Sequence, residues 1–125
     1  MSKRLTKEQA EAIRRKQDVL NNGLYTPIPH RLYREILPQM QAKYGKADAR
    51  DALFIYGYLH AFVNGESDKD VYLWTYLSVD QIVERTGIDR SRIKPLCDIL
   101  ENEGLLITEV KRTATGRKKY YMPLL

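Results

Sequence analysis

Apolar residues recur at helical spacing in the first third of the chain, in two stretches separated by prolines. Residues 6–20 carry a thin apolar stripe and open with a capping box, in which the side chains of Thr6 and Gln9 satisfy each other's backbone amides. Residues 30–44 repeat the helical pattern, but Pro38 falls inside it and predicts a kink or a break. The pattern therefore predicts two helices, of which the second is irregular.

A third stretch, residues 47–64, is the most apolar part of the chain. From residue 52 to residue 63 nearly every side chain is apolar, and a helix that is apolar on all sides is buried on all sides. Such a helix is either surrounded by the other helices or shared with a second subunit. We expect a mixture of the two, with a homodimer formed through this region.

Residues 71–77 are rich in β-branched and aromatic side chains and predict a strand. Alternation assigns Tyr72, Trp74 and Tyr76 to one face of this strand. An aromatic face of this kind can stack on nucleobases, but it is more often part of a core or of an interface.

Residues 78–103 predict two helices joined by a tight turn. Ser78 and Gln81 form a second capping box, so the first helix should begin at residue 79, with an inner face of Val79, Ile82 and Val83. Gly87 suits the left-handed conformation that ends a helix.

The second helix of this pair has one apolar face and one basic end. Its apolar face consists of Ile93, Leu96, Cys97 and Leu100. Asp89 or Ser91 can cap its first turn. Because Pro95 would remove a hydrogen bond from the interior of the helix, we expect the regular helix to begin nearer Ser91 than Asp89.

Residues 105–110 and 118–122 predict two strands, joined by a seven-residue loop at residues 111–117 with a glycine near its end. The chain has a formal net charge of +5, and much of its positive charge lies in two segments without Asp or Glu. Residues 90–94 hold three cations at the start of a helix, and residues 111–119 hold five in the hairpin.

Both segments suit contact with DNA. A helix N-terminus attracts phosphate, and arginine reads guanine in the major groove. A basic hairpin suits the phosphate backbone or the minor groove, although lysines at a sheet edge can also serve solubility alone. The candidate DNA-binding residues are Arg90, Ser91, Arg92, Lys94, Lys111, Arg112, Thr113, Thr115, Arg117, Lys118 and Lys119.

The order of a helix, a TGID turn, a second helix ending in NEGLL and a basic hairpin resembles the winged helix-turn-helix superfamily over residues 77–123. This resemblance implies a DNA-binding fold in which the second helix enters the major groove. The upstream half is weakly similar to N-terminal domains of plasmid and phage replication initiators. The fold expected is mainly α with a small antiparallel β-hairpin, namely a winged helix-turn-helix with extra N-terminal helices.

The sequence contains no evident catalytic constellation. His30 and His60 are far apart, and the single cysteine, Cys97, excludes the usual zinc signatures and an intrachain disulfide. No glycine-rich phosphate loop, signal peptide or membrane-length apolar run is present. We therefore expect no enzyme activity, no cofactor, no metal and no membrane segment, in a cytoplasmic protein associated with the nucleoid or with a plasmid.

We expect an N-terminal helical arm at residues 1–24 and a winged helix domain at residues 25–125, with the helix-turn-helix at 78–103 and the wing at 105–123. The function expected is sequence-specific binding of double-stranded DNA by a homodimer, in transcriptional regulation, plasmid partition or replication. The N-terminal helices offer a surface for a partner protein. The alternative is a winged helix that serves as a protein-interaction module, with the acidic and aromatic segment 51–77 as its working surface.

Overall fold

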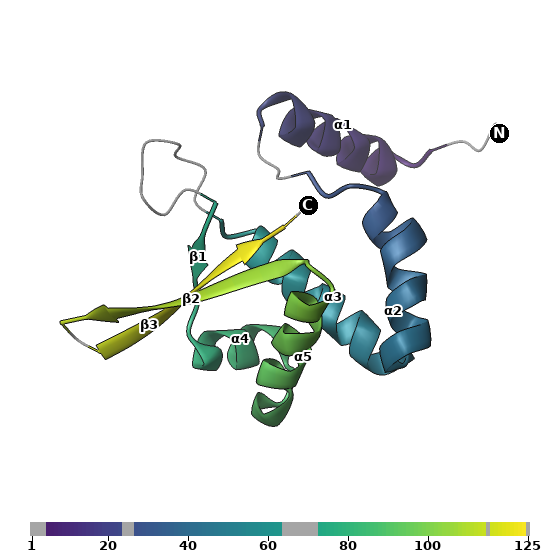
Figure 1. Cartoon of the computed structure of the whole chain (residues 1–125). Coiled ribbons are helices and arrows are strands. Elements are labelled where there is room, and N and C mark those ends of the chain that lie inside the picture. Colours follow the sequence, from purple (N-terminus) through teal and green to yellow (C-terminus); the bar gives the residue numbers. More distant parts are fainter. Residues whose placement is uncertain (1–4, 24–26, 64–72, 115, 125) are drawn as a thin grey trace.

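A computed structural model describes residues 5–23, 27–63, 73–114 and 116–124. The chain is mainly helical, as the sequence predicted, and the predicted antiparallel hairpin is part of a small sheet of three strands (Figure 1). The elements run in the order α1 (Lys7–Asn21), η1 (Leu32–Ile36), α2 (Leu37–Tyr44), α3 (Lys46–His60), β1 (Thr75–Tyr76), α4 (Val79–Thr86), α5 (Arg90–Asn102), β2 (Leu106–Thr113) and β3 (Gly116–Pro123). The expected arm boundary at residue 24 lies outside the described residues.

The two N-terminal helical segments form where the pattern placed them. The capping box of Thr6 and Gln9 starts α1, as predicted. The helix does not break at Pro38, since the backbone stays helical from Leu32 to Tyr44, but the π-helical turn η1 gives way to the α-helix α2 one residue before the proline. Proline has no N–H to donate to a carbonyl four residues back, so the hydrogen-bond register changes there.

Helix α3 lies at the centre of the molecule and packs against α2, α4, α5 and β3. Ala52, Ile55 and Leu59 on its inner side are fully buried. The neighbouring elements of the same chain cover only part of its circumference, and Phe54 on the open side is 55% exposed. The chain alone therefore does not bury this helix on all sides, and the expected sharing of it with a second subunit stays a prediction. At the end of α3, Nε2 of His60 donates to the carbonyl of Pro27 at 3.0 Å, which fixes the segment before η1 to this helix.

The paired helices α4 and α5 form as expected in most details. Ser78 and Gln81 make the capping box of α4, and Gly87 ends that helix with a left-handed φ of 73°. The predicted apolar face of α5 is buried throughout, at Ile93, Leu96, Cys97 and Leu100. Of the predicted inner face of α4, Ile82 is buried, whereas Val79 is exposed because it lies at the very start of the helix.

The start of α5 differs from the prediction. The helix begins at Arg90, so Pro95 lies within it rather than in its first turn. Asp89 occupies the cap position, but its carboxylate accepts a hydrogen bond from Oγ of Ser91 at 2.5 Å and caps no backbone amide. The helical backbone therefore extends to Arg90 without a side-chain cap. One backbone hydrogen bond is missing inside the helix, because Pro95 has no N–H to donate.

The sheet has the strand order β1-β3-β2. Within the described part of the predicted strand at 71–77, only Thr75 and Tyr76 form β1, and Leu73 has a left-handed φ of 67° that is incompatible with a strand. Residues 71 and 72 lie outside the described residues. Thr75 pairs with Tyr121 and Tyr76 with Tyr120. The first pair is buried against the core, and the second lies on the outer face of the sheet.

The β2–β3 hairpin is longer than predicted, and its turn is tighter. The strands remain paired from Leu106 opposite Pro123 to Thr113 opposite Gly116, so only residues 114 and 115 connect them. Oγ1 of Thr113 donates to the carbonyl of Gly116 at 2.8 Å, and the φ of Gly116, 127°, is accessible to glycine. The expected seven-residue loop was wrong, and its cations lie instead on regular strands.

Candidate nucleic-acid interface

Cations stand directly opposite one another near the tip of the β2–β3 hairpin. Lys111 faces Lys118, and Arg112 faces Arg117, across neighbouring positions of the ladder. Like charges opposite each other destabilise an antiparallel pair. Among the residues that the structure describes, neither Arg112 nor Arg117 has a side-chain partner. The hairpin protrudes from the rest of the described chain (Figure 1), so the hydrogen-bond donors of both guanidinium groups are available to a ligand.

The alternation of side chains divides the hairpin cations between two faces. Arg112, Arg117 and Lys119 share the face that carries Tyr121 into the core at the base of the hairpin. Lys111 and Lys118 share the outer face with Tyr120. The tip consequently presents positive charge in both directions perpendicular to the sheet.

The three lysines of the hairpin make cation–π contacts with tyrosine rings. The Nζ atom lies 5.3 Å from the ring centre of Tyr120 for Lys111, 5.2 Å from that of Tyr76 for Lys118, and 5.5 Å from that of Tyr121 for Lys119. Contacts of this kind stabilise exposed sites by about 0.5–1 kcal/mol each. They restrict the lysine stems without neutralising the ammonium charge.

Of the two candidate threonines, the structure describes only Thr113. The hydroxyl of Thr113 is engaged in the turn through its bond to Gly116, so it has a structural role at the hairpin tip. Thr115 lies outside the described residues.

The start of α5 is the second candidate surface, and there the structure adds carboxylates that the local sequence does not contain. Arg90 forms an ion pair with Asp80 of α4. Lys94 pairs with Asp98 one turn further along α5, at 3.1 Å. Both pairs are largely exposed, and exposed pairs exchange readily with solvent ions or with phosphate.

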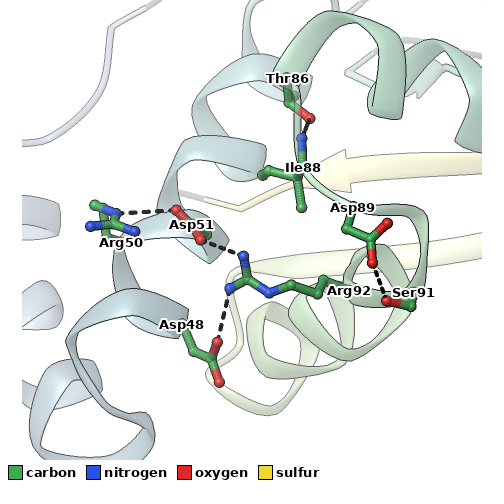
Figure 2. Close-up of polar contacts among 8 residues, drawn as sticks. All are labelled: Asp48, Arg50, Asp51, Thr86, Ile88, Asp89, Ser91 and Arg92. Carbon is green, nitrogen blue, oxygen red and sulfur yellow. Dashed lines mark hydrogen bonds and ion pairs between the residues drawn. The ribbon is translucent and has the colours of Figure 1, made fainter.

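Arg92 is held more firmly than its neighbours. Its guanidinium lies 2.7 Å from Asp51 and 2.9 Å from Asp48, both on α3, so that it bridges the two helices (Figure 2). Partial burial alone would raise the pKa of Asp51, but hydrogen bonds from Arg92 and Arg50 outweigh it and hold the pKa below its usual value. The same hydrogen bonds raise the pKa of Arg92.

Segment 90–94 contains no Asp or Glu, but in the folded chain the carboxylates of other residues lie next to each of its cations. The i,i+4 spacing of Lys94 and Asp98 was a sequence signal for one of these pairs. Arg92 lies 41 residues from Asp51 and 44 from Asp48, and no local pattern links them. The structure brings the three cations to one helix end, with Arg92 turned toward α3 and Arg90 and Lys94 more exposed.

Other kinds of site find little support in the described residues. They contain no group of three or more His, Cys, Asp or Glu side chains arranged to hold a metal ion. Cys97 is buried, and burial raises the pKa of its thiol to about 11, which leaves it protonated and unreactive. Within these ranges no helix has the length and apolar character needed to cross a bilayer.

A scan against protein-family models, a search of curated proteins and a search of solved structures each find no match to this chain.

Proposed function

We propose that the chain binds double-stranded DNA as a winged helix-turn-helix protein, with α5 in the major groove and the β2–β3 hairpin as the wing. The arrangement of α4, the Gly87 turn, α5 and a hairpin whose second strand pairs with β1 supports this fold. The observation that carries the proposal is the pairing of like charges at the hairpin tip. An anionic backbone that bound there would relieve a repulsion which the isolated chain retains.

The start of α5 would contribute in two ways. Arg90, Ser91 and Lys94 lie on its exposed side, near the helix N-terminus that attracts phosphate. These side chains would contact bases and backbone after Arg90 and Lys94 exchange their carboxylate partners for DNA. Arg92 would act mainly by fixing the position of α5 against α3.

The biological settings that suit such a protein are transcriptional regulation and the partition or replication of a plasmid or phage. In each case the protein would reside with the nucleoid or with a plasmid in the cytoplasm. A homodimer would place two copies of α5 in successive major grooves, about 34–36 Å apart, on a site with two-fold symmetry. No cofactor or catalytic step is required by this proposal.

Fluorescence anisotropy on unrelated duplexes at several salt concentrations tests the proposal. The double variant Arg112→Ala, Arg117→Ala should weaken binding to every duplex and reduce the slope of log K against log salt by about two, one for each lost phosphate contact. The matched control, Arg31→Ala with Lys46→Ala, removes the same charge from the starts of η1 and α3, outside the hairpin, and should change little. If the hairpin variant and the control bind alike, the wing assignment is wrong.

The alternative function, a protein-interaction module, makes a different prediction in the same titration. Wild-type protein that bound no duplex at low salt, or bound with no salt dependence, would contradict DNA binding and favour this alternative. Within the segment proposed for that role, 51–77, residues 64–72 lie outside the described residues.

A further inference from the structure

Helix α1 is amphipathic, but its apolar side is left uncovered. Ala10, Ile13, Gln17 and Leu20 follow helical spacing along one side. Within Lys7–Asn21 no side chain is buried, and Ile13 and Leu20 are 44% and 50% exposed. A helix of 15 residues is marginal in water unless its apolar side packs against something. The apolar side of α1 is therefore available to a partner surface.

Arg14 and Lys16 flank the apolar stripe of α1, and the other charged residues lie farther round the helix. Lys7, Glu11 and Arg15 are spaced four residues apart and alternate in sign, as do Arg14 and Asp18. Such pairs support a helix whose charged side stays in water. This side can remain solvated while the stripe of Ile13 and Leu20 docks.

A second uncovered apolar surface lies between the η1–α2 segment and α3. It is a groove of about 180 Å³ lined by Tyr33, Leu37, Arg50, Leu53 and Phe54. Phe54 and Tyr33 are each more than half exposed, although both side chains are large and mainly apolar. The floor is rigid, because Leu53 is buried in the core. A groove of this kind between two helices suits the apolar side of a third helix.

We propose that α1 of one copy docks in this groove of a second copy, and that the exchange is reciprocal. The chain carries both halves of the contact but does not bring its own halves together, since α1 lies outside the bundle with no residue buried (Figure 1). In a two-fold dimer the helix-in-groove contact forms twice, because each copy supplies both an α1 and a groove. This dimer does not depend on DNA binding.

Analytical ultracentrifugation of the full chain over a range of concentrations tests the dimer. Ile13→Ser on α1 and Phe54→Ser in the groove should each weaken dimerisation at least tenfold. Val110→Ser is the matched control, because Val110 is as exposed as Phe54, at 55%, but lies on the hairpin. A wild-type chain that stays monomeric, or a dimer that Phe54→Ser leaves unchanged, would overturn the proposal. Circular dichroism confirms that each variant is folded.

Cross-linking separates the reciprocal exchange from other arrangements. An Ile13→Cys chain is mixed with a Phe54→Cys chain and treated with a short bis-maleimide; the native Cys97 is buried and does not compete. The proposal requires a cross-link between the two different chains. A link formed mainly between two Ile13→Cys chains would instead show α1 pairing with α1. In a double variant, a link confined to single chains would show that α1 folds back on its own groove. Either result would overturn the exchange.

Discussion

The guanidinium of Arg92 lies 2.7 Å from the carboxylate of Asp51, and this contact joins the start of α5 to the central helix α3. In sequence, Arg92 has the position of a base-reading residue near the beginning of a recognition helix. In the structure it is committed to two carboxylates of its own chain. We infer that it determines how α5 is presented, while the neighbouring cations are the ones available to a ligand.

The Asp51 contact should make stability depend on acid pH. Because the pKa of Asp51 in the folded chain lies below its ordinary value of 3.8, its contribution to the free energy of unfolding is complete above that value and is lost as the pH falls through the lower folded pKa. Urea unfolding at pH 7, 5 and 3 should show Asp51→Asn less stable than wild type at pH 7, with the difference shrinking at pH 3. Asp98→Asn, at an exposed pair, is the control. If the free energies of unfolding of Asp51→Asn and wild type differed by the same amount at all three pH values, ionisation of Asp51 would not contribute to stability.

Asp80 should weaken DNA binding, because it occupies Arg90 and adds negative charge beside α5. Asp80→Asn should tighten binding to duplex DNA by roughly two- to fivefold at low salt, the scale expected for an exposed charge pair. Asp18→Asn on α1 removes the same charge far from α5 along the chain and should have little effect. If Asp80→Asn leaves the affinity unchanged, Arg90 does not contact DNA.

Reversing one charge at the hairpin tip should move stability and binding in opposite directions. Arg117→Glu places a carboxylate opposite Arg112, so the free energy of unfolding should rise by ~0.2–1 kcal/mol. DNA affinity should fall, and by more than in Arg117→Gln, which removes the repulsion without adding an anion. Urea unfolding and anisotropy on the same preparations measure both effects. Unchanged affinity in Arg117→Glu would mean that the hairpin cations serve solubility.

Replacing Pro95 should make the folded chain more stable. It lies inside α5, where it cannot donate to the carbonyl of Ser91. Pro95→Ala should raise the free energy of unfolding by up to about 3 kcal/mol, the difference between proline and alanine within a helix. Lys94→Ala, at the adjacent exposed position, should change it far less. An unchanged urea midpoint would show that α5 accommodates the proline without loss.

The features that sequence predicted well depend on residues within one helical turn of each other. The capping boxes at Thr6 and Ser78, the end of α4 at Gly87 and the buried face containing Leu96 are of this kind. Their hydrogen bonds and spacing are fixed by the local backbone alone. The composition of the hairpin also located its cations, because basic residues cluster there regardless of the turn.

The features that sequence missed depend on contacts between distant segments. Which side of α3 the same chain leaves open, here that of Phe54, depends on where the other helices pack, and apolar composition does not specify that. The partners of Arg92 come from a helix more than 40 residues away. The length of the hairpin was missed because pairing of like charges, as at Lys111 and Lys118, contradicts the usual rule for strand partners.

Two consecutive residues of α3, Arg50 and Asp51, connect the groove to the start of α5. Arg50 lines the groove and donates to Asp51, which in turn accepts from Arg92 at the start of α5. If a second copy that docks against Leu53 and Arg50 shifts the Asp51 carboxylate, it also shifts α5. Thermodynamic reciprocity then requires DNA to change the dimer constant by the same factor by which dimer formation changes DNA affinity. A chain of this size could in this way respond cooperatively to its own concentration without any effector.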